Sequence, residues 1–140
     1  MNTWILYAIL SMVFAGLTSV LAKYGLQNIS ADFGLGIRTT VIFIAITFLN
    51  IIGARYKEFT ALTCLQIILL IASGITTTLS WLFYYRAMKD GLVSYVVAID
   101  KGSIVITLLF SFILLKEPVT PKIVLGGTLI TAGTLILIWK

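Results

Sequence analysis

The sequence predicts an all-α membrane protein with five transmembrane helices, and two observations carry that prediction. Of the 140 residues, 60% are hydrophobic and 11% are charged, whereas a soluble domain carries about 25% charged residues. A chain of this size has too little interior to bury so much apolar surface, so a lipid bilayer is the solvent that the composition fits. The apolar residues also form long continuous runs, which argues against the alternating pattern of a transmembrane β-barrel.

Each apolar run approaches the roughly 20 residues that a helix needs to cross a hydrocarbon core, at about 1.5 Å of rise per residue. Lys23 and Gly25 end the first run, Thr60 is the expected N-cap of the third, and Pro118 and Pro121 separate the fourth from the fifth. No segment is long or polar enough to link two domains. We therefore expect a single transmembrane domain over residues 1–140, with spans at about 4–22, 35–53, 62–85, 92–115 and 123–139.

The first run also allows a second interpretation, a cleaved signal peptide. The residues Val20, Leu21 and Ala22 form a weak small-residue cleavage pattern. The run lacks a basic segment before it and is too long for the apolar part of a signal peptide. These features favour a transmembrane span.

The ten basic residues give a net charge of +5 but do not form a cluster. Most of them fall singly or in pairs at the ends of apolar runs, as the flanks of membrane helices do. They form no basic strip for phosphate binding, so we expect no nucleic-acid partner. The sequence has no His and a single Cys, Cys64, which excludes a Cys–His zinc site and an intrachain disulfide. Without paired acids or a phosphate-binding glycine-rich loop, we expect neither an enzyme nor an ATP-driven pump, and no cofactor.

The basic residues leave the orientation of the chain in the membrane nearly balanced. With five spans, the N-terminal tail, second loop and fourth loop share one side and carry four basic residues, while the other side carries five when Arg38 is counted with the first loop. Since Lys and Arg asymmetry sets the direction of insertion, this balance fits insertion in both orientations, with two opposite copies pairing. The alternative is one fixed orientation set by charges near the first helix.

Four features follow one another along the chain: Arg38 in the second span, the run Trp-Leu-Phe-Tyr-Tyr-Arg-Ala-Met at 81–88, the pair Val93-Ser94, and the run Leu-Lys-Glu-Pro at 115–118 before a glycine-bearing last span. In this order and spacing they resemble one repeat of the EamA-like transporters in the drug/metabolite transporter superfamily, over essentially the whole chain. The resemblance implies an inner-membrane protein of a bacterium or archaeon that transports small organic metabolites or drugs. Long members have ten spans, built from two inverted five-span repeats around a central cavity.

This chain holds one repeat, so the resemblance implies an antiparallel homodimer with ten helices, driven by a gradient, that rocks around a midplane site. The alternative is an accessory subunit that pairs with a different five-span protein and carries no site of its own. The fourth span departs from the family pattern because Ile104 stands where a proline follows the polar kink, and Gly102 is expected to supply the flexibility instead. The first span contains no acid, unlike that of the related small multidrug resistance proteins, which disfavours a quaternary-cation exporter.

Asp100 is the one acid well inside an apolar run, about 12 Å from the start of its span at 1.5 Å per residue. We expect Asp100 to be a titratable coupling group and Lys101 to be its partner or an anion contact. Neighbouring helical residues point about 100° apart, so one of the two should meet a partner on another helix, with Arg38 and Arg86 as candidates. The alternatives are a structural ion pair, or a shorter helix that leaves both residues at the interface.

Trp81 and Tyr84 end the third span beside a face of hydroxyl side chains, and we expect them to form walls for a planar or cationic substrate. Arg38 is the remaining candidate contact for a substrate or coupling ion. The alternatives are helix packing or an interfacial position for the aromatic residues, and snorkelling to the interface for Arg38.

Small residues form a stripe on the fifth span. Gly126 and Gly133 lie seven residues apart on one face, and Gly127 lies alongside them. Such stripes allow the backbones of two helices to approach closely. We expect this one to serve either packing within one chain or dimerisation.

Overall fold

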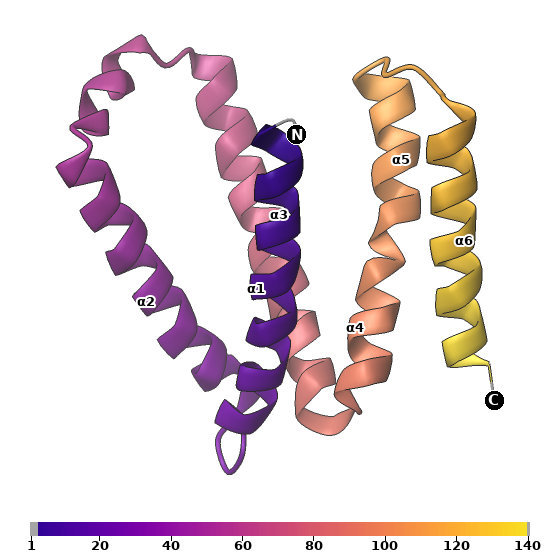
Figure 1. Ribbon diagram of the computed structural model, residues 1–140. Coiled ribbons are helices and arrows are strands. Elements are labelled where there is room, and N and C mark those ends of the chain that lie inside the picture. The colour runs from indigo at the N-terminus through magenta and orange to yellow at the C-terminus, as the bar shows by residue number, and fades with distance from the viewer. Residues whose placement is uncertain (1–2, 140) are drawn as a thin grey trace. The chain divides into compact units, whose positions relative to one another are not determined.

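The computed structural model describes residues 3–139. Outside the described residues lie Met1, Asn2 and Lys140. Lys140 is one of the basic residues counted above for the orientation of the chain. All regular elements in the described part are helical, and five stretches are long and apolar enough to cross a membrane, as predicted (Figure 1). The contacts divide the chain into two compact units, one ending at Asp90 and the other beginning at Gly91.

The first unit contains α1 (Thr3–Gly25), α2 (Ala31–Ile52), the 3-10 helix η1 (Arg55–Ala61) and α3 (Cys64–Asp90). α3 packs against both α1 and α2. A short loop, residues 26–30, joins α1 to α2, and α3 returns to the same end of the unit as that loop (Figure 1). We call this the loop-1 end of the unit.

Polar side chains set two helix starts in this unit. The Ser30 hydroxyl accepts a hydrogen bond from the Phe33 N–H at 3.3 Å, so α2 begins about one turn earlier than expected. Thr60 is not a helix cap, because it lies inside η1. Instead, the Thr63 N–H donates to the Gln66 side chain at 2.8 Å, and the Gln66 N–H donates to the Thr63 hydroxyl at 3.3 Å. This reciprocal capping box places the start of α3 at Cys64.

α3 runs to Asp90, beyond the expected end of the third span at Tyr85. Arg86 and Lys89, which the sequence places in a polar loop, are therefore helical. Both find hydrogen-bond partners at the loop-1 end, so their charges do not oppose the continuation of the helix.

The second unit contains α4 (Val93–Lys101), α5 (Ser103–Leu114) and α6 (Pro121–Ile138). The expected fourth span is interrupted at Gly102, whose N–H donates to the Ile99 carbonyl at 2.9 Å, three residues back instead of four. A Cβ at position 102 would lie 2.9 Å from that carbonyl oxygen, so the close turn favours glycine. The helix thus breaks at Gly102 without a proline.

α6 begins at Pro121 and packs against α4 and α5. Gly127 is buried, and a Cβ there would lie 2.7 Å from the Leu108 Cδ1 of α5. The absence of a side chain therefore lets α6 approach α5. In contrast, a Cβ at Gly126 or Gly133 would meet nothing within 4 Å.

Few large apolar side chains are buried in the described chain. The buried hydrophobic residues gather towards the loop-1 end of the first unit: Leu26, Ala31, Leu35, Tyr85 and Met88. Most other large apolar side chains are exposed, which is the expected state of surfaces that contact lipid or another chain.

Candidate substrate pocket

Charged side chains tie the three long helices of the first unit together at the loop-1 end. Arg86 of α3 donates to both carboxylate oxygens of Asp32 in the first turn of α2, at 2.9 and 2.8 Å. Lys89 Nζ donates to the carbonyls of Leu26 and Ile29 at 2.7 and 2.8 Å. The bidentate pair fixes the register of α2 against α3, and Lys89 pins the loop between α1 and α2.

Two further contacts join α1 to α3. Lys23 Nζ donates to the carbonyls of Met88 and Lys89 at 2.8 and 3.1 Å, which supplies donors to the C-terminal end of α3. The hydroxyls of Ser19 and Tyr84 share a hydrogen bond of 2.8 Å. The loop-1 end is therefore held by directional contacts.

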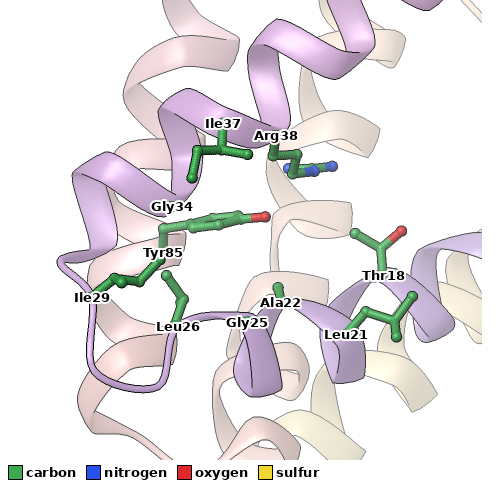
Figure 2. A pocket seen from close by; sticks show the side chains of 10 residues that line it. All are labelled: Thr18, Leu21, Ala22, Gly25, Leu26, Ile29, Gly34, Ile37, Arg38 and Tyr85. Carbon is green, nitrogen blue, oxygen red and sulfur yellow. The ribbon is translucent and has the colours of Figure 1, made fainter.

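A cavity of about 330 Å³ lies beside these contacts, within the first unit (Figure 2). Its volume falls at the lower end of the range of about 300–1,000 Å³ that is typical of small-molecule sites. Its walls are mostly apolar and come from α1, the loop 26–30, α2 and α3, including Ala22, Leu26, Gly34, Arg38 and Tyr85.

Arg38 is the one charged residue in the lining of this cavity. Its Cζ lies 4.3 Å from the centroid of the Trp81 ring and 5.6 Å from that of Tyr85, both on α3. These cation–π contacts orient the guanidinium. Within residues 3–139, no carboxylate forms an ion pair with Arg38.

Tyr85 of α3 forms another wall of the cavity, beside Leu26 and Ile29 of the loop (Figure 2). Its side chain is 3% exposed, and its ring contacts that of Tyr84 in a tilted arrangement, with 6.3 Å between centroids. Figure 2 shows its hydroxyl directed into the cavity, on the side of Arg38. The cavity therefore combines one cation, one phenol hydroxyl and apolar walls.

The structure brings two of the predicted site residues, Arg38 and Trp81, together. We expected a solute to contact the Trp81 ring, but Arg38 lies over that ring instead. Tyr84 points to Ser19 of α1 instead of lining the cavity. Sequence reasoning did not select Tyr85. The signal that could have identified it is its position four residues after Trp81, on the same helical face.

Asp100 and Lys101 belong to the second unit, where Lys101 is the partner of Asp100, as one of the expectations had it. Their side chains pair with each other, with Asp100 Oδ2 3.8 Å from Lys101 Nζ, and no side chain of α5 or α6 bonds to either. Long side chains can bend around the helix and so overcome the angle between neighbouring positions. Arg86 and Arg38, the expected partners, are instead engaged by Asp32 and by Trp81.

Comparison with known proteins agrees with this architecture. The EamA-like transporter family matches residues 2–139. A protein from Sinorhizobium sp. that is named "Uncharacterized transporter in cobO 3'region" is 36% identical over 136 residues, which cover 97% of this chain and 96% of that protein. No solved structure matches. With five apolar helices and a family match over nearly its whole length, this integral membrane protein belongs to the EamA-like transporter family.

Proposed function

We propose that this chain is a gradient-driven secondary transporter of small organic metabolites or drugs, and that it works as a pair of chains in a bacterial or archaeal inner membrane. The observation that carries the proposal is the family match over residues 2–139, combined with a cavity of small-molecule size between membrane-crossing helices. A gradient is the proposed energy source because the sequence has no phosphate-binding glycine-rich loop. The five apolar helices and the family match support a location in a membrane.

The proposed pair is an antiparallel homodimer in which each chain contributes one five-span domain. The Sinorhizobium protein is matched over 96% of its length, so it also has about the length of one repeat. The near balance of basic residues between the two sides favours insertion in both orientations. The open backbone at Gly126 and Gly133 offers α6 as a contact for the second copy.

Asp100 is the proposed coupling group. It lies in a membrane-crossing stretch, two residues before the break at Gly102, and acids at such depth are costly and usually functional. Its contact with Lys101, at 3.8 Å, is longer than the 2.7–2.9 Å or so of a close charged hydrogen bond.

The proposal is tested with purified protein in liposomes that contain a pH-sensitive dye and are exposed to a panel of small acids, amines and amino acids. We expect at least one solute to move protons in a protein-dependent way. Asp100→Asn should abolish this movement because the amide cannot titrate, while protein yield stays the same. Asp90→Asn, which alters an exposed acid at the end of α3, is the matched control and should retain it.

Two outcomes contradict the proposal. Proton movement that persists in Asp100→Asn removes this residue from the coupling step. A protein that moves no solute alone, but does so together with a different five-span protein, identifies an accessory subunit instead.

A further inference from the structure

We propose that the cavity beside Arg38 binds the oxyanion group of a small solute with an apolar body, so that the substrate of this transporter is an organic anion such as a carboxylate. The inference rests on the proposed transport function, and it names the chemical class of the solute. It assigns Arg38 and Tyr85 as the polar contacts and the apolar walls as the contact for the rest of the molecule.

The first argument is the charge of the cavity. Arg38 is partly buried, and no carboxylate of residues 3–139 neutralises it. Asp32, six residues earlier on α2, binds Arg86 through both of its oxygens. A cation in a mostly apolar pocket attracts an anion strongly and repels another cation, because few polar groups screen it.

The second argument is geometric. The Cζ of Arg38 lies over the Trp81 ring, and the N–H donors of a guanidinium lie in its own plane. A planar fork of donors matches the two oxygens of a carboxylate. The Tyr85 hydroxyl, directed into the same space, is a further donor for such an oxygen (Figure 2).

The third argument concerns access. Lys23, Arg86 and Lys89 all lie at the loop-1 end. Among the described residues of the first unit, the acids at this end are Asp32 and Asp90. Together with Arg38 this makes four cations and two carboxylates, a local net charge of +2. Such an excess raises the local concentration of anions near the cavity.

The test uses fluorescence of Trp81 in the full-length protein, reconstituted in lipid nanodiscs of zwitterionic lipid. Trp4→Phe and Trp139→Phe remove the other two tryptophans, both of which are exposed. The probes are benzoate, benzyl alcohol and benzylammonium, which share a ring and differ in charge. We expect saturable quenching by benzoate, with affinities for the other two probes at least about tenfold weaker, as loss of one charge-assisted contact implies.

Variants separate binding from packing. Arg38→Met should weaken benzoate binding at least about tenfold while leaving that of benzyl alcohol unchanged. Arg38→Lys keeps the charge without the planar fork and should retain part of the affinity. Tyr85→Phe should lower benzoate affinity by a smaller factor, and it supplies a readout even if Arg38→Met fails to fold. Arg55→Met removes the same charge from η1 and should change nothing.

Benzoate that binds no better than benzyl alcohol, or binding that is insensitive to both Arg38 and Tyr85 variants, overturns the proposal. An anionic lipid could supply the same oxyanion, so the assay is repeated with phosphatidylglycerol in the discs. If this lipid changes Trp81 fluorescence in an Arg38-dependent way and benzoate does not, the site binds a lipid headgroup and the solute proposal fails.

The two proposals fail separately. Arg38-dependent benzoate binding without solute-driven proton movement supports the anion site and contradicts the transport proposal. Proton movement driven only by amines, without Arg38-dependent anion binding, supports transport and overturns the anion site.

Discussion

The two units of the chain hold their helices together by different means. In the first unit, side-chain hydrogen bonds join residues far apart in sequence: Ser19 with Tyr84, and Asp32 with Arg86. In the described part of the second unit, side-chain contacts between polar groups are local. Asp100 pairs with its neighbour Lys101, and the Ser111 hydroxyl bonds to Glu117 six residues away.

This difference bears on the role of each unit. Hydrogen bonds are directional, so they fix the register of α1, α2 and α3 and allow a cavity with set walls. The second unit relies on apolar contacts and on Gly127 against Leu108, which bring helices close without fixing a polar site. This difference supports the proposed solute site in the first unit, and we expect the second unit to contribute the contact with another copy.

The largest expected effect tests the packing of the loop-1 end. A Cβ at Gly34 would lie 2.5 Å from Leu26 Cδ2 and 3.3 Å from Ile29 Cδ1, whereas one at Gly36 would meet nothing within 4 Å. Gly34→Leu should therefore destabilise the protein by roughly 1–3 kcal/mol relative to Gly36→Leu. Both substitutions gain the same intrinsic helix propensity, so their difference isolates the steric clash.

Unfolding of the two variants in mixed micelles measures this difference. Benzoate binding measured on the same samples reports the cavity, and only Gly34→Leu should reduce it. Equal stability of the two variants would mean that the loop moves freely away from α2. The hydrogen bonds of the first unit would then not fix its helices more firmly than apolar contacts fix those of the second unit.

A second glycine pair tests the role of the other unit. Gly127→Leu should disturb the packing of α6 on α5 within one chain, because Leu108 occupies the space. Gly133→Leu has open space around it and should leave the single chain intact while weakening the pair of chains by about tenfold or more. The measurements are unfolding of the monomer, and the monomer–dimer distribution at increasing lipid dilution.

A Gly133→Leu protein that pairs as tightly as the unchanged protein would remove this face of α6 from the interface. A protein that is monomeric at every dilution and still transports would contradict pairing altogether. A change in pairing in Gly133→Leu with unchanged unfolding is the outcome that supports the assigned role.

Local signals in the sequence explain which parts of the architecture could be predicted. Long apolar runs determine the five spans, and the lack of a Cβ marks Gly102 as the break. The start of α3 was misplaced because Thr60 and Thr63 are both acceptable caps, and Gln66 three residues after Thr63 decides between them.

The meeting of Arg38 with Trp81 was not predictable from local signals. It depends on the register between α2 and α3, which the Asp32–Arg86 pair fixes across 54 positions of sequence. The sequence identifies both residues as unusual in a membrane helix, but it gives no distance between them. For the same reason the sequence could not show that Tyr84 contacts Ser19 of α1. Nor could it show that the adjacent Tyr85 lines the cavity.

The smallest expected effect concerns the hydrogen bond between Ser19 and Tyr84, which joins α1 to α3 at 2.8 Å. A double-mutant cycle of Ser19→Ala and Tyr84→Phe should give a coupling of about 0.6 kcal/mol, the average for hydrogen bonds between membrane helices. The value should be small because the Ser19 hydroxyl also bonds to the Ala15 carbonyl at 3.0 Å and keeps that partner when Tyr84 changes. Thr60→Val, which removes a bond within η1 to the Lys57 carbonyl, is the control and should show no coupling to Tyr84→Phe, because η1 lies at the opposite end of α3. A Ser19–Tyr84 coupling of zero would show that α1 is held only by Lys23 and apolar packing, and the directional character assigned to the first unit would then belong to α2 and α3 alone.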